Sequence, residues 1–191
     1  FAESDGVLPT APLAMTPAGL EAEGGDVFIL FRADADPNLS RVFHSRLMTP
    51  ITFDEYSFTP TSGNGAGPVT RIAVSPDELF MAHESAGTTT IYRRPRSDFA
   101  GTNAILVDSA GRGTIGEMAF ARFNSVDFLF YGDLWRSEIV RQRIGQARGS
   151  YVSTDSSPYF TRVNGTCATF IDSPAPGGYD VHTVFVNGEG S

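Results

Sequence analysis

One stretch of the sequence decides the fold: PVTRIAVSPDELFMAH at residues 68–83, followed after four residues by TTTIYRR at 88–94. Apolar and β-branched residues dominate both runs, and Ser-Pro-Asp at 75–77 interrupts the first. Proline presets a backbone dihedral angle and aspartate bonds back to the backbone, so this triplet predicts a tight turn. We therefore expect an inner strand ending at Val74, then strands at Leu79–Glu84 and Thr88–Arg94.

The same pattern recurs along the chain at a spacing near 46 residues. Val74 and Phe120 occupy equivalent inner-strand positions next to the small residues Ala73 and Ala119, and Phe170 is the expected third equivalent. A weaker copy opens the chain around Met15. The further strands expected in these copies are Asp26–Arg32, Ser40–Ser45, Asp127–Tyr131, Glu138–Ile144 and Val181–Val186.

An outer strand completes each unit. The candidates are Thr52–Thr59, Asn103–Val107 and Ser150–Thr154, and Phe1-Ala2-Glu3 is the candidate for the last unit. Four strands per unit at this period predict an all-β fold, a β-propeller of about four blades, alone or as part of a larger propeller. The expected domain spans 1–191, with blades at 8–60, 68–108, 113–155 and 159–191, the last completed by 1–3.

The run from Pro68 to Arg94 resembles a blade of the WD40-like repeat family. In that family an inner strand ends in Ser-Pro-Asp and leads through a tight turn to two further strands. The ending Ile-Tyr-Arg-Arg at 91–94 is most similar to the propeller repeats of tailed-phage virion proteins and bacterial secreted proteins. The chain departs from the family because it has neither the Gly-His nor the Trp-Asp signature and carries Glu78 at the usual turn glycine.

Composition limits the classes of function. The chain has 191 residues, enough for one domain with a substantial core, and 15 Phe, which favours sheet. The longest apolar runs, at 27–31 and 128–131, are far shorter than the roughly 20 residues that a membrane helix needs. A net charge of −8, with all 14 basic residues Arg, argues against nucleic-acid binding. Cys167 is the one cysteine, so no disulfide forms within the chain.

Residues that could carry catalysis are sparse. The three histidines, His44, His83 and His182, show no metal-binding spacing, and no nucleophile or phosphate-binding motif is present. We expect His83 to lie at a strand end with a surface hydrogen bond. The sequence therefore predicts a protein that is not an enzyme and has no cofactor.

Two polar clusters remain as candidate sites. Asp34, Asp36 and Asn38 place oxygen ligands at alternate positions, as at the start of a calcium loop, but Leu39 replaces the sharp-turn glycine, and a hairpin tip is the main interpretation. The other cluster is the candidate partner-binding patch, in which Trp and Arg favour an interface. A solvated edge and, for the tryptophan, a contact between blades are the alternatives. The patch consists of Trp135, Arg136, Arg141 and Arg143.

These observations predict a structural or interaction propeller. The expected partners are other protein subunits of a large assembly such as a phage virion, with no nucleic acid and no membrane insertion. The alternative is a carbohydrate-binding propeller that mediates surface attachment. Both hypotheses place the protein in a virion or outside the cell.

Overall fold

The computed structural model describes residues 15–36, 39–46, 53–56, 67–98, 103–123, 125–136, 138–145, 150–153, 158–164, 167–175 and 178–185; from residue 150 onward the description covers the backbone. These residues form strands, turns and links, with no helix among them. No helix in the described chain is therefore long enough to cross a membrane.

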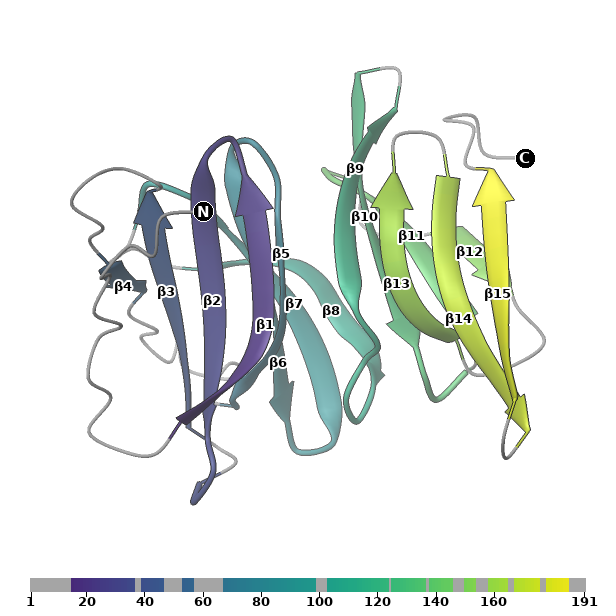
Figure 1. The fold of residues 1–191 in the computed structure, drawn as a ribbon, viewed down its shortest axis with the longest axis horizontal. Coiled ribbons are helices and arrows are strands. Elements are labelled where there is room, and N and C mark those ends of the chain that lie inside the picture. Colours follow the sequence, from purple (N-terminus) through teal and green to yellow (C-terminus); the bar gives the residue numbers. More distant parts are fainter. Residues whose placement is uncertain are drawn as a thin grey trace, which may run out of the picture.

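The strands form four antiparallel sheets that follow one another in the chain (Figure 1). We call the four sheets A to D in chain order. The prediction of an all-β fold with four-stranded antiparallel sheets is confirmed, and sheet D, the last, has three strands in the described chain. Sheet A contains β1 (Met15–Glu23), β2 (Asp26–Ala33), β3 (Ser40–Arg46) and β4 (Phe53–Tyr56). Sheet B contains β5 (Val69–Val74), β6 (Glu78–Ser85), β7 (Thr88–Pro95) and β8 (Ala104–Arg112). Sheet C contains β9 (Met118–Phe123), β10 (Val126–Asp133), β11 (Glu138–Arg143) and β12 (Ser150–Ser153), and sheet D contains β13 (Pro158–Asn164), β14 (Cys167–Ala175) and β15 (Gly178–Phe185).

The first strand of each sheet faces the first strand of the next. β1 contacts β5, β5 contacts β9, and β9 contacts β13, whereas β1 and β13 do not contact each other in the described chain. The first strands therefore line the inside of an arc, and the later strands lie progressively outward. This is the arrangement of propeller blades around an axis.

Sheets A and B pack through one apolar cluster. Alternation along the strands turns one set of side chains from each sheet into the interface, where water is excluded. Phe28 and Leu30 in β2 and Leu79 and Met81 in β6 are fully buried there. The other members of the cluster are Val42, Tyr56, Val69, Ile72 and Val74.

Sheets B and C pack through a second cluster built on the opposite face of sheet B. Ala73, fully buried in β5, gives Phe80 room to stack against Phe120 of β9, with ring centroids 6.3 Å apart. The repeat predicts that Val74 and Phe120 are buried equivalents in the inner strands, and each of them faces the preceding sheet. Phe120 is half-buried, which is less than expected. The buried members of this cluster also include Ala82, Ile91, Ala110, Ile115, Met118, Leu129, Tyr131 and Val140.

The turn after Val74 forms as predicted, but a different side chain closes it. Ser75 Oγ accepts hydrogen bonds from the backbone N–H groups of Glu78 (2.8 Å) and Asp77 (3.3 Å). The Ser75 N–H donates to the Glu78 carbonyl at 2.9 Å. Serine rather than aspartate therefore makes the local side-chain bonds, because its short hydroxyl lies directly over the turn amides.

Two expectations are wrong. Phe170 lies in β14, the second strand of sheet D, because β13 precedes it and takes the inner position. The prediction relied on the spacing of Phe170 from Phe120 and on the nearby small residue Ala168. His83 is 3% exposed rather than at the surface. Its Nδ1 lies 3.0 Å from the carbonyl oxygen of Gly67, where glycine is needed because a Cβ would lie 1.4 Å from the Glu84 carbonyl oxygen.

Candidate functional site: an aromatic–cationic patch at one end of the sheets

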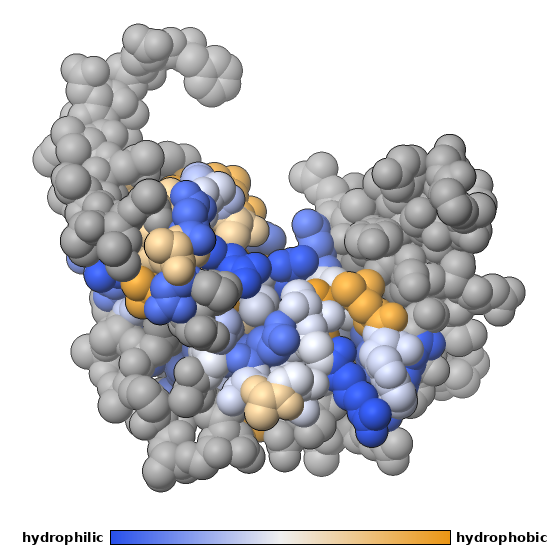
Figure 2. Space-filling view, turned by 90° about the horizontal axis from the view of Figure 1, so that it is seen from below, coloured by the Kyte–Doolittle hydropathy of each residue, from blue (hydrophilic) through white to orange (hydrophobic). Residues whose placement is uncertain are grey.

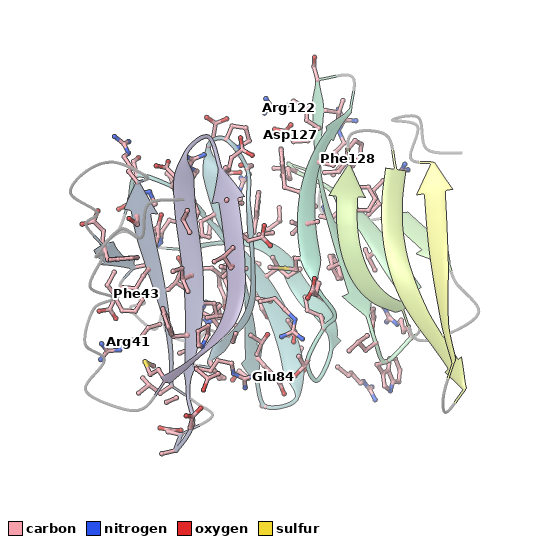
Figure 3. The ribbon with its side chains drawn as sticks, viewed as in Figure 1. Arg41, Phe43, Glu84, Arg122, Asp127 and Phe128 are labelled. Atoms are coloured by element: carbon pink, nitrogen blue, oxygen red, sulfur yellow. The ribbon has the colours of Figure 1, made fainter. Side chains whose placement is uncertain are left out.

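Several turns with exposed side chains lie at one end of the sheets. We define this loop end by the β6–β7 turn at Ala86-Gly87, the β10–β11 turn at 134–136 and the link 113–117 between β8 and β9. In Figure 3, Glu84 lies toward this end, whereas Arg122 and Asp127 lie at the opposite end. Figure 2 views the molecule from the loop end, where hydrophilic residues and apolar patches lie side by side in the coloured surface.

Among the described residues of the loop end, Trp135 is the exposed large aromatic side chain, at 56%. It lies in the β10–β11 turn, which Asp133 holds in place. Asp133 is 1% exposed, and its Oδ1 accepts hydrogen bonds from the backbone N–H groups of Trp135 (3.1 Å) and Arg136 (3.2 Å). The turn is therefore preorganised, and the indole ring projects from a rigid support.

Two guanidinium groups lie over the Trp135 ring. The Cζ atom of Arg112 is 4.5 Å from the ring centroid, and that of Arg136 is 5.7 Å away. Both distances are within the range of cation–π attraction. Arg136 also approaches Asp133, with 3.6 Å between Nη1 and Oδ2. We call Arg112, Trp135 and Arg136 the Trp135 patch.

Arg112 reaches the patch from the neighbouring sheet. It is the last residue of β8 and pairs with Thr88 of β7. The next residue, Gly113, donates its N–H to the Gly87 carbonyl at 2.8 Å and accepts a 2.5 Å hydrogen bond from the Thr89 hydroxyl. These bonds fix the end of β8 to β7 and the β6–β7 turn, and the contact of Arg112 with Trp135 makes the patch bridge sheets B and C.

The structure brings together two of the four sequence-predicted patch residues. Trp135 and Arg136 are neighbours in the turn, whereas Arg141 and Arg143 lie further along β11. Arg141 is half-buried and stacks over Phe128, 5.3 Å from its ring centroid, and Arg143 is exposed and pairs with Phe128 near the other end of the sheet. The sequence interpretation missed Arg112. Its strand ends on the same side as the β10–β11 turn, and only the pairing of whole sheets reveals that.

A second group of charged residues lies on the inner strands. Burial first, and the neighbouring Glu117 carboxylate second, raise the pKa of Glu21 in β1 to about 7. Burial lowers the pKa of Arg71 in β5, with Glu117 opposing that shift and Arg32 adding to it. Glu21 is thus a carboxyl group that titrates near neutral pH. In the described chain, no group of three His, Cys, Asp or Glu side chains is arranged to hold a metal ion.

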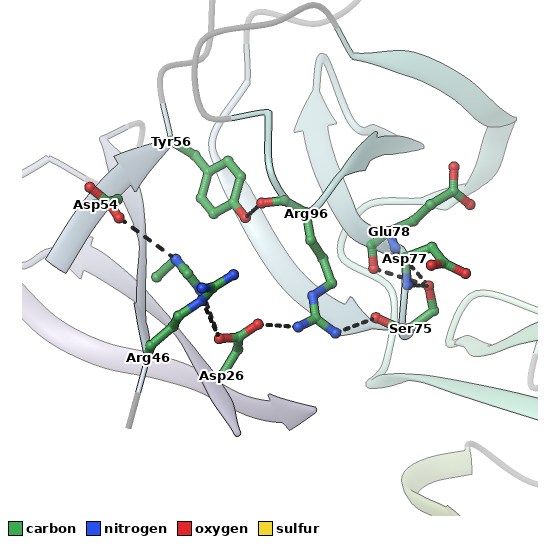
Figure 4. A network of polar contacts seen from close by, with 9 residues as sticks. Asp26, Arg46, Asp54, Tyr56, Ser75, Asp77, Glu78 and Arg96 are labelled. Carbon is green, nitrogen blue, oxygen red and sulfur yellow. Dashed lines mark hydrogen bonds and ion pairs between the residues drawn. The ribbon is translucent and has the colours of Figure 1, made fainter. Parts of the chain in front are cut away.

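A polar network joins sheets A and B at the end opposite the patch (Figure 4). Asp26, 8% exposed, lies 3.3 Å from His44 Nε2 and 3.4 Å from Arg46 Nε, and it accepts a short hydrogen bond from Arg96. Arg96 also donates to the Ser75 carbonyl at 3.2 Å. Burial raises the pKa of Asp26, but the hydrogen bonds and charges of Arg96 and His44 outweigh it, so the net pKa lies below its ordinary value. This network holds two sheets together.

Residues 34–36 and Leu39 lie between β2 and β3 in the described chain. Asp34 Oδ1 accepts a 2.6 Å hydrogen bond from Thr16 Oγ1, and the Leu39 N–H donates to the Asp36 carbonyl at 3.0 Å. Asn38 lies outside the described residues. Asp34 is thus engaged with the neighbouring strand β1.

Comparisons with known proteins identify the fold type. No model of a known protein family matches the chain, and no curated protein sequence matches it. A solved structure of a luciferin-regenerating enzyme matches with a TM-score of 0.54 and 12% sequence identity, over 83% of this chain and 54% of that chain. That enzyme is a β-propeller, so the match shows a propeller-like fold. The chain spans about half the length of that structure, and at this identity the likeness concerns the fold alone.

Proposed function

We propose that this chain is a non-catalytic interaction module, a propeller-type subunit that contacts other proteins of a larger assembly through its loop end. The observation that carries the proposal is Trp135, 56% exposed on a turn that the buried Asp133 holds rigid. Tryptophan and arginine together dominate the energetics of protein interfaces, and rigid presentation lowers the entropy lost on binding.

Four titratable side chains with structural partners support a non-catalytic role. Buried Asp26 bonds to His44 within sheet A and to the half-buried Arg96 that follows β7, and His83 is buried against the Gly67 carbonyl. Burial lowers the pKa of His83, while the Gly67 hydrogen bond opposes the shift and Arg94 adds to it, so its imidazole is neutral at pH 7. These groups act as structural bonds between neighbouring elements.

The resemblance of residues 68–94 to propeller repeats of tailed-phage virion proteins and bacterial secreted proteins supports a setting in a virion or outside the cell. The alternative function is carbohydrate binding, for which an exposed indole ring is a common stacking surface. Two guanidinium groups already lie over the Trp135 ring, which favours a protein partner over a neutral sugar.

The test is co-assembly. The chain carrying Trp135→Ala and Arg136→Ala is expressed in its native source, and its incorporation into particles is followed by sedimentation and size-exclusion chromatography. We expect incorporation to fall at least about tenfold, which corresponds to about 1.4 kcal/mol of lost interface free energy. The matched control is Arg143→Ala, which removes an exposed arginine at the other end of sheet C and is expected to incorporate normally.

Equal incorporation of both variants would remove the loop end from the proposal. A hydrolase or lyase activity of the purified chain, abolished by substitution of one of its described acids, would overturn the non-catalytic reading.

A further inference from the structure

We propose that the Trp135 patch is a recognition site for carboxylate side chains, and that its partner is an acidic segment of another protein. This inference rests on the proposed function and adds the chemistry of the partner. It is carried by the geometry of Arg112 and by the balance of charge around Trp135.

Arg112 has a free hydrogen-bonding edge. Its guanidinium lies 4.5 Å from the Trp135 ring centroid, and it makes no hydrogen bond or ion pair with another described residue. A guanidinium stacked on an aromatic ring keeps the N–H donors at its rim directed away from the ring. Those donors match the two oxygens of a carboxylate, which arginine binds bidentately.

Trp135 strengthens the binding of a carboxylate by Arg112. The indole ring covers part of Arg112 and excludes water from it, and interactions of a charge strengthen where water is excluded. The ring also holds the long arginine side chain in one orientation, so less rotamer entropy is lost when a carboxylate binds.

The charge of the patch is locally positive in an acidic protein. Arg112 and Arg136 contribute two positive charges, and Asp133 returns one negative charge through its 3.6 Å approach to Arg136. The chain as a whole carries −8. At physiological ionic strength the field of distant charges is screened beyond about 8 Å, so a bound carboxylate responds chiefly to the two arginines. The acidic remainder of the surface repels the same partner elsewhere, which restricts it to this site.

The chain supplies its own reporter for this site, because Trp135 is the one tryptophan in the sequence. Its fluorescence therefore reports on the patch alone. In the free protein, the anionic quencher iodide should quench this fluorescence more strongly than the cationic quencher caesium, because the ring is flanked by two arginines.

The experiment titrates the full chain with a hexaglutamate peptide, and with hexaglutamine and hexalysine as matched peptides. We expect hexaglutamate alone to change Trp135 emission in a saturable way, to protect the ring from iodide, and to bind more weakly as salt rises. Arg112→Gln should weaken the binding at least about tenfold, and Arg136→Gln should weaken it less because Asp133 already neutralises part of that charge.

Arg143→Gln is the control, since it removes an exposed arginine of the same sheet without touching the patch. Circular dichroism of each variant checks that the sheets are intact. Unchanged emission at millimolar hexaglutamate, an equal response to hexaglutamine, or equal losses in Arg112→Gln and Arg143→Gln would each overturn the inference. So would a response to a sulfated oligosaccharide without one to hexaglutamate, which would identify a glycan as the ligand. If hexaglutamate fails while Trp135→Ala with Arg136→Ala still abolishes co-assembly, the proposed function stands and the carboxylate chemistry does not.

Discussion

The hydroxyl of Tyr56 donates a 2.5 Å hydrogen bond to the backbone carbonyl of Arg96, 40 positions further along the chain. Tyr56 ends the last strand of sheet A, and Arg96 follows the third strand of sheet B. The tyrosine is 1% exposed, so this bond forms out of water. Asp26 binds the guanidinium of the same arginine. Two residues of sheet A therefore hold Arg96 in position, one through its backbone and one through its side chain.

The first prediction concerns that bond. Tyr56→Phe keeps the ring against Phe28 but leaves the Arg96 carbonyl without its donor. We expect the free energy of unfolding to fall by about 1–3 kcal/mol, the cost of an unsatisfied buried acceptor. Urea denaturation followed by circular dichroism measures it. A loss below about 0.5 kcal/mol would show that water replaces the hydroxyl.

The second prediction concerns acid stability. Burial raises the pKa of Asp26, but the bonds and charges of Arg96 and His44 bring it below its usual 3.8, so the folded protein holds this carboxylate ionised more readily than the unfolded chain does. Its stabilising contribution is therefore present above about pH 4 and is lost as the pH falls below that value. Asp26→Asn should lower stability at pH 7 and flatten the decline below pH 4. A decline of unchanged steepness in this variant would assign acid denaturation to other carboxylates.

The third prediction concerns Glu21, whose ionisation affects stability in the opposite direction to that of Asp26. Burial and the neighbouring Glu117 raise the pKa of Glu21 from 4.5 to about 7, so ionising this group opposes folding. Stability is greatest while Glu21 is protonated and falls as the pH rises from 4.5 to 7. Glu21→Gln should stabilise the protein at pH 8 by about 1–2 kcal/mol, a value reduced from the full shift because the group is partly solvated. Below pH 4.5 the variant and the parent should agree, and a stabilisation independent of pH would contradict this origin.

The fourth prediction compares the two rings that stack between sheets B and C. Phe80 is fully buried and Phe120 is half-buried, although their centroids are 6.3 Å apart. Phe80→Ala should cost about 3–5 kcal/mol and Phe120→Ala about 1–3 kcal/mol, since less apolar surface leaves water at Phe120. Thermal or urea denaturation of both variants under identical conditions provides the comparison. Equal costs would mean that Phe120 is covered more completely than its exposure indicates.

The strands were predictable because their signals are local. Apolar runs bounded by turn residues gave β2, β3, β6, β7, β10 and β11 to within one or two residues, and the spacing of the copies gave the sheets. The inner strand of sheet D was assigned wrongly, to β14 in place of β13. An inner strand is defined by its contact with the neighbouring sheet, and this contact is not visible in the sequence of the strand. Pro158–Asn164 carries no pattern of its own that distinguishes an inner strand from an outer one.

The patch was half predictable for the same reason. Trp135 and Arg136 are adjacent in sequence, and their place in a turn between two strands follows from the pattern. Arg112 enters the patch only through the packing of sheet B on sheet C, and Arg141 leaves it because its side chain stacks on Phe128. Sequence patterns identify the strands and the turns between them. Which residues of two different sheets meet in one site depends on how the sheets pack, and the sequence pattern does not show this.

Every contact between sheets in the described chain joins consecutive sheets: A with B, B with C, and C with D. Such a row has nearest-neighbour energetics, in which the stability is the sum of one contribution per sheet and one per interface. Weakening the A–B interface through Asp26 or Tyr56 should therefore release sheet A while B and C remain paired, and amide hydrogens in β6 and β10 should exchange last. Sheet A can therefore unfold separately from the rest of the chain. The Trp135 patch lies between sheets B and C and stays intact during this partial unfolding.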